Sequence, residues 1–137
     1  MSNPPIARSI FHACLVGVFA VAGLAGLWAA ASVFLRGPCA FMAVVATVDV
    51  ALLLRLSAFA SGRARAVAGL VIVAVAIPVG LYVAAVASIG RVMGVLPHKA
   101  FALTSPEFAA LWLRFNLGWM DALWVLAGLV LAWRLSR

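Results

Sequence analysis

The sequence predicts an all-α, polytopic membrane protein, a four-transmembrane-helix antiparallel bundle. The composition, four long apolar runs and the placement of charges support this prediction. Of 137 residues, 68% are hydrophobic and 9% are charged, whereas soluble domains are near half apolar and a quarter charged. A spanning helix needs about 20 apolar residues. Four spans with short connections therefore use almost the whole chain, which we treat as a single domain, 1–137.

The first apolar run covers about 9–35 and follows a short segment that contains Arg8. A secretory signal sequence can begin in this way. The run is longer than the apolar core of a typical signal, so we expect an uncleaved first span.

The second and third runs cover about 39–60 and 66–90. The turn before the second run is so short that the first two spans must be antiparallel neighbours. The third run is rich in Val and Ala. Beta-branched residues do not prevent a helix there, because lipid forces backbone hydrogen bonds to close within the segment.

The only long connection, 91–107, mixes apolar residues with Pro, His and Lys, and we expect it to lie on the membrane surface. The pattern Thr104-x-x-Glu107 is that of a capping box, so a helix should begin near Ser105. That fourth helix is expected to run without a break, with its spanning part at about 108–133.

The basic residues predict the orientation of the spans. Ten basic residues against three acidic ones give a net charge of +7. Cytoplasmic loops of membrane proteins carry the excess of Lys and Arg. The two loop sets are Arg8, Arg63, Arg65, Arg134 and Arg137 on one side and Arg36, Arg91 and Lys99 on the other. The sequence therefore predicts both termini in the cytoplasm (N-in, C-in), in a membrane such as the bacterial inner (plasma) membrane.

Two carboxyl groups fall near the middle of predicted spans, Asp49 in the second and Asp121 in the fourth. An ionised side chain at that depth costs about 2.5–3.5 kcal/mol on insertion scales and marks a functional candidate. Arg114 precedes Asp121 by seven residues, so one continuous helix places both on one face. These three residues are candidates for binding or proton handling. The simpler interpretation of each Asp is a protonated side chain that makes one hydrogen bond between helices.

A second set of candidates lies in the long connection and at its end: Arg91, His98, Lys99 and Glu107. Basic residues at a membrane surface contact lipid phosphates. We therefore expect Arg91, His98 and Lys99 to contact lipid head groups, with Glu107 as a further candidate at the end of the connection.

Other sites and classes find no support in the sequence. There is no GxSxG, HExxH, phosphate-loop or Ser-Lys motif, and too little chain lies outside the membrane to build a nucleic-acid-binding surface. Cys14 and Cys39 fall at opposite faces of the membrane and cannot pair within one subunit. We expect no metal site and no cofactor.

Three functions remain, of which the first is favoured. The chain could be a small non-catalytic membrane subunit or accessory protein that binds lipids or other membrane helices, as part of a larger assembly or a homo-oligomer. It could instead be a proton-coupled small transporter or channel that uses Asp49 and Asp121. The third hypothesis is a lipid head-group enzyme. Because no catalytic motif supports the third, the sequence favours a protein that is not an enzyme.

Overall fold

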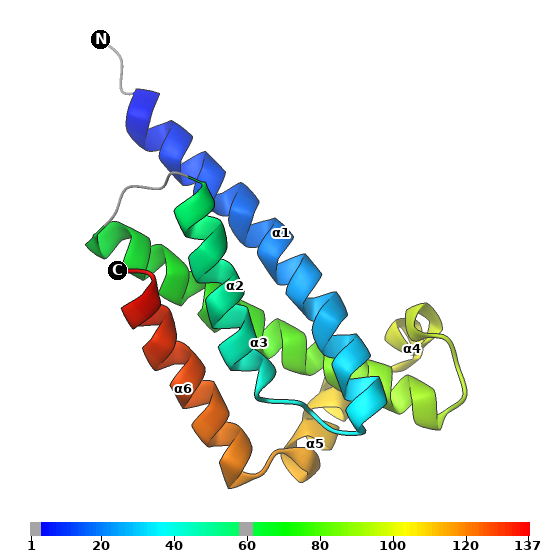
Figure 1. The fold of residues 1–137 in the computed structure, drawn as a ribbon. Coiled ribbons are helices and arrows are strands. Elements are labelled where there is room, and N and C mark those ends of the chain that lie inside the picture. Colours follow the sequence, from blue (N-terminus) through cyan, green and yellow to red (C-terminus); the bar gives the residue numbers. More distant parts are fainter. Residues whose placement is uncertain (1–3, 58–61) are drawn as a thin grey trace.

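The computed structural model describes residues 4–57 and 62–137, with side chains from Ile10 onward, and each regular element in this part of the chain is a helix. In order they are α1 Pro4–Leu35, α2 Met42–Leu56, α3 Arg63–Val92, α4 Pro97–Leu103, α5 Pro106–Asn116 and α6 Trp119–Leu135 (Figure 1). The all-α prediction is confirmed. The end of the predicted second run, residues 58–60, lies outside the described residues.

Two of these helices are long and apolar enough to cross a membrane: Ile10–Leu35 within α1, and α3. Helix α2 has 15 residues, or about 22 Å of helix against about 30 Å of hydrocarbon core. Helices α5 and α6 pass the same test of length and composition only together, and they are bent by 105° at the break between them. The composition therefore indicates a membrane protein, and the four-span bundle stays a prediction.

The main helices alternate in direction along the chain. Helices α1 and α3 run the same way and pack along each other, whereas α2 and α6 run the opposite way (Figure 1). The start of α1 and the end of α6 therefore lie at the same end of the molecule, which we call the terminal end. The opposite end, where α1 and α3 finish, carries α4 and α5 and is called the α4–α5 end.

One buried tryptophan holds α1 against α3. Trp28 is fully buried, and a Cβ on Gly80 of α3 would collide with its indole ring. The indole Nε1 donates a hydrogen bond of 2.7 Å to the carbonyl oxygen of Pro38, in the loop after α1. The same side chain therefore fixes both the approach of α3 and the course of the loop that leads to α2.

Close backbone approach also joins α2 to α6. The hydroxyl of Thr47 lies 2.9 Å from the carbonyl oxygen of Ala43 and 2.8 Å from that of Gly128. A Cβ on Gly128 would lie only 2.9 Å from the Ala43 carbonyl oxygen. Small residues at this contact bring the two helices together, as is common between membrane helices.

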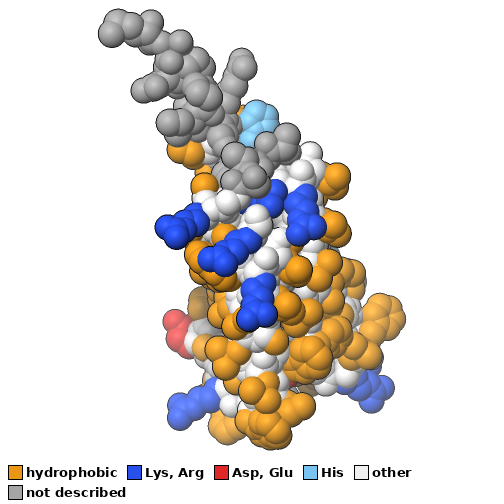
Figure 2. Space-filling model, turned by 60° about the vertical axis from the view of Figure 1, so that its left-hand side comes forward, with side chains coloured by type: hydrophobic (Ala, Val, Ile, Leu, Met, Phe, Trp, Pro, Cys, Tyr) orange, Lys and Arg blue, Asp and Glu red, His pale blue; other side chains and the backbone are white. Residues whose placement is uncertain are grey.

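Arginines at the terminal end hold the end of α6. Arg55 donates to the carbonyl oxygen of Leu135 at 3.1 Å, and Arg65 donates to those of Ser136 and Arg137 at 2.9 and 2.7 Å. Cations are favourable beside the carbonyl groups that a helix leaves free at its end. Lys and Arg side chains gather in the upper part of the face in Figure 2, and hydrophobic side chains cover most of its lower part.

The fourth helix differs from the prediction of one continuous element. It is interrupted after Asn116, because Leu117 and Gly118 have extended backbones. The cap before it also differs: Ser105 accepts the hydrogen bond from the Phe108 amide at 3.2 Å, while Thr104 ends α4. Taken together, α5 and α6 are long and apolar enough for one span, so overall hydropathy did not predict the break.

Candidate functional site

The break between α5 and α6 separates two of the predicted site residues. Arg114 lies in the last turn of α5, and Asp121 lies in the first turn of α6. The two helices meet at 105°, so the expectation that one helix face carries both side chains is wrong. Its premise was a regular helix across Gly118, which the extended backbone at that residue contradicts.

Asp121 has a local structural role at the α4–α5 end. Its Oδ2 accepts a hydrogen bond of 2.7 Å from the amide of Gly118 and so caps the start of α6. Cys39, before α2, lies close enough to sense this charge: burial raises the pKa of the Cys39 thiol, and the carboxylate of Asp121 raises it further. Asp121 therefore lies at the start of a helix instead of midway along one.

Asp49 keeps the position that its place in the sequence predicts, in the middle of α2. It is half-buried and lines a groove of about 390 Å³ between α1 and α2. We call this the Asp49 groove; its other lining residues are apolar or Gly: Phe19, Ala20, Gly23, Leu24, Leu27, Val45 and Leu53.

The Asp49 carboxyl group makes no hydrogen bond or ion pair with the described residues. The nearest hydroxyl along the helix, that of Thr47, is already engaged with carbonyl oxygens of α2 and α6. The groove thus presents one polar group without a partner, among residues that are otherwise apolar or Gly.

The α1 side of the groove leaves room for another chain. A Cβ on Gly23, which lines the groove, would meet nothing within 4 Å, and neither would one on Gly26 of the same helix. Packing among the described residues therefore explains neither glycine. Phe19 is 71% exposed and Leu27 54% exposed on the same helix. Glycine on an exposed membrane helix lets a second helix approach closely. The α1 side of the groove is therefore open and mostly apolar.

The predicted head-group residues do not form one cluster in the structure. Arg91 lies in the last turn of α3 and donates to the carbonyl oxygen of Val33 in α1. His98 and Lys99 are exposed on α4, and Glu107 is exposed in the first turn of α5. Arg91 instead shares a pocket with Arg36. Within residues 4–57 and 62–137, no group of three or more His, Cys, Asp or Glu side chains could hold a metal ion.

The sequence placed Arg36 and Arg91 in the same loop set, on one side of the membrane, but it did not predict that they share a pocket. Helices α1 and α3 run in the same direction and end together. Two successive reversals of the chain predict that shared end, whereas the contact between the two helix ends depends on how α1 and α3 pack.

Comparison of the chain with protein-family models, with curated proteins and with solved structures finds no match.

Proposed function

We propose that this chain is a small non-catalytic integral membrane protein that binds a transmembrane helix of another subunit along the Asp49 groove. The observation that carries the proposal is the carboxyl group of the half-buried Asp49, which has no partner within the described residues and lines one groove with the open Gly23 of α1. The partner helix is proposed to place a hydrogen-bond donor, such as a Lys, Arg or Ser side chain, against this carboxyl.

The energetics favour a partner at this position. A carboxylate in the middle of a bilayer costs about 2.5–3.5 kcal/mol on insertion scales. Hydrogen bonds between membrane helices contribute about 0.6–2 kcal/mol, so a donor from a partner offsets part of that cost. Close packing against Gly23 adds contact area, because no side chain stands in the way.

A different subunit is the preferred partner over a second copy. In a symmetric pair, Asp49 would meet residues from the same region of the other copy. The nearby Thr47 hydroxyl is engaged with its own helices, and the other residues of the groove offer no donor side chain. Two copies would have to share a proton between two carboxyl groups. We therefore propose a hetero-oligomeric accessory role.

We further propose that α1, α2, α3 and the α5–α6 pair each cross a bacterial plasma membrane, with both termini on its cytoplasmic side. The alternating helix directions and the shared terminal end support this topology. The larger set of loop arginines at the terminal end, which marks the cytoplasmic side in membrane proteins, supports the orientation. Lipids would then surround the exposed apolar surface.

A photo-crosslinking amino acid at Val45, in the groove, tests the helix-binding proposal. The expected result is a crosslink to one partner subunit that is lost in Asp49→Leu and largely kept in Asp49→Asn, which can still accept a hydrogen bond. The matched control places the crosslinker at Val48, which is exposed on α2 but outside the groove. An equal crosslink from Val48, or one that survives Asp49→Leu, would contradict the proposal.

A further inference from the structure

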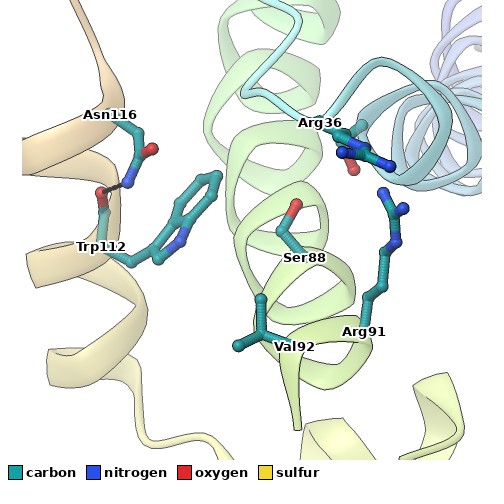
Figure 3. A pocket seen from close by; sticks show the side chains of 7 residues that line it. Arg36, Ser88, Arg91, Val92, Trp112 and Asn116 are labelled. Carbon is teal, nitrogen blue, oxygen red and sulfur yellow. Dashed lines mark hydrogen bonds between the residues drawn. The ribbon is translucent and has the colours of Figure 1, made fainter. Parts of the chain in front are cut away.

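A polar pocket of about 460 Å³ lies at the α4–α5 end, between the last turns of α1 and α3 and the helix α5. Six polar or aromatic side chains line it: Ser32, Arg36, Ser88, Arg91, Trp112 and Asn116. Figure 3 shows the head groups of the two arginines pointing toward each other on one side of the pocket and the indole of Trp112 on the other. The hydroxyl of Ser88 lies between them.

The side chains of Arg36 and Arg91 bring two positive charges to the same pocket. A guanidinium group stays protonated in proteins, and no carboxylate pairs with Arg36 or Arg91 within the described residues. The Arg36 guanidinium makes no hydrogen bond with those residues either. Arg91 uses Nη1 to donate to the Val33 carbonyl, and its other N–H groups have no assigned acceptor. An anion in the pocket would replace the repulsion between the two groups by attraction to both.

The hydroxyl of Ser88 adds a second, independent feature. Its Oγ is buried and has no hydrogen-bond partner. The neighbouring Ser32 is different, because its Oγ donates to the Ala29 carbonyl at 2.8 Å. An unpaired buried hydroxyl is costly and calls for a partner. Ser88 can supply that missing bond by donating to an anion oxygen.

The loop that carries Arg36 has a backbone conformation that residues with a side chain rarely adopt. Arg36 has φ +58° and Cys39 has φ +50°, both in the left-handed region that non-glycine residues rarely adopt. The bond from the Trp28 indole to the Pro38 carbonyl fixes the loop between them. Such strain is often found where a side chain is held for function. Here it directs the Arg36 side chain toward the pocket.

We propose that this pocket binds a phosphate group, with Arg36 and Arg91 as the charge partners and Ser88 Oγ as a hydrogen-bond donor. The planar guanidinium matches two oxygens of a phosphate at once. The phosphate can belong to a lipid head group or to a small soluble ester. The rim suits a lipid, because Val92, which lines the pocket, is apolar and 87% exposed.

Native mass spectrometry of the full chain in a neutral detergent tests this proposal with three probes. These are dioleoylphosphatidylglycerol, dioleoylglycerol, which lacks the phosphate, and glycerol phosphate as a soluble competitor. One bound phosphatidylglycerol is expected, and no comparable binding of dioleoylglycerol. Failure of glycerol phosphate to compete would assign the site to a lipid phosphate; effective competition would assign it to a soluble phosphate ester. Equal binding of the two lipids would overturn the proposal.

Variants of the arginines make the test specific. Arg36→Gln should weaken phosphatidylglycerol binding about tenfold, because a charge-assisted hydrogen bond is lost. Arg36 is the decisive position, since its guanidinium makes no hydrogen bond in the described fold, whereas Arg91→Gln also removes the contact with Val33. The matched control is Arg114→Gln, which removes an exposed charge at the same end outside the pocket.

The control and the hydroxyl variant decide the outcome. Arg114→Gln should change the affinity less than about twofold, and Ser88→Ala should lower it about threefold, the loss expected for one neutral hydrogen bond. Equal losses in Arg36→Gln and Arg114→Gln would mean unspecific attraction to positive charge and would overturn the site. The pocket and the Asp49 groove are separate, so either proposal can fail without the other.

Discussion

At the scale of single residues, helix glycines of this chain lie in two different surroundings. Gly80 and Gly128 make room inside the molecule, one for the Trp28 ring and the other for the Ala43 carbonyl. Gly23 and Gly26 of α1 face open space instead. A glycine weakens a helix relative to alanine, so the two open glycines have no benefit within this fold. That contrast is the residue-level basis for assigning a partner to the α1 surface.

Gly80→Ala should destabilise the protein. The new Cβ would collide with the Trp28 ring, and forcing an extra methyl into a packed contact costs about 1–3 kcal/mol. The expected result is a lower melting temperature in detergent, measured by loss of helical circular dichroism. Gly26→Ala is the control and should leave the melting temperature unchanged or raise it, because alanine favours a helix. Equal effects of the two variants would contradict the packing described for Trp28.

Cys39 should react slowly with alkylating reagents until the pH is high. Burial and the Asp121 carboxylate both raise the pKa of its thiol, and only the thiolate reacts. In a Cys14→Ala background, Asp121→Asn should shift the pH midpoint of alkylation to lower pH, because a negative neighbour is lost. The pH midpoint of the alkylation rate measures the pKa of the Cys39 thiol. The rate at high pH measures how accessible the thiol is to the reagent. An unchanged midpoint would mean that the Asp121 charge does not act on Cys39.

At the scale of elements, the long apolar helices were predictable and the broken one was not. α1 and α3 follow from uninterrupted runs, since hydropathy and length suffice to place a helix in lipid. The break at Gly118 depends on the local backbone and on the Asp121 carboxylate that caps the new helix start. The sequence placed Asp121 in mid-span on hydropathy alone, and hydropathy does not detect a helix cap.

Asp121→Ala should destabilise α6 by about 0.5–2 kcal/mol, the usual cost of a lost helix cap. The carboxylate accepts a hydrogen bond from the Gly118 amide, and that amide would lose its partner at the helix start. Chemical denaturation in detergent, followed by circular dichroism, measures the change. Glu107→Ala removes an acidic residue from the first turn of α5, where its side chain makes no hydrogen bond with the described residues, and should cost less. A larger loss for Glu107→Ala would refute the capping role of Asp121.

At the scale of the whole molecule, the candidate sites depend on how the helices come together. Asp49 was predicted as a candidate because its depth in the second run could be counted. The groove beside Asp49 was not predicted, because its shape depends on how α1 and α2 pack in the fold. The pocket of Arg36 and Arg91 likewise joins the ends of two helices that are distant in the sequence. The position of Asp49 along its helix was therefore predictable, and neighbours across helices were not.

The direction of the whole bundle in the membrane gives the last prediction. Arg63 begins α3 at the terminal end, and Lys99 is exposed on α4 at the other end. Since the excess of loop arginines marks the cytoplasmic side, the terminal end should face the cytoplasm. With Cys14 and Cys39 replaced by Ala, a membrane-impermeant maleimide added to intact cells should label Lys99→Cys.

Arg63→Cys is the paired variant for this measurement and should be labelled only after the membrane is made permeable. The two positions lie at opposite ends of the same helical bundle, so a single orientation requires opposite results. Labelling of Arg63→Cys but not Lys99→Cys in intact cells would mean that the bundle has the opposite orientation in the membrane. The phosphate pocket would then face the cytoplasmic leaflet, where anionic lipids are concentrated. Labelling of both from outside would mean that the chain between them does not cross the membrane, which would refute the proposal that α3 spans it.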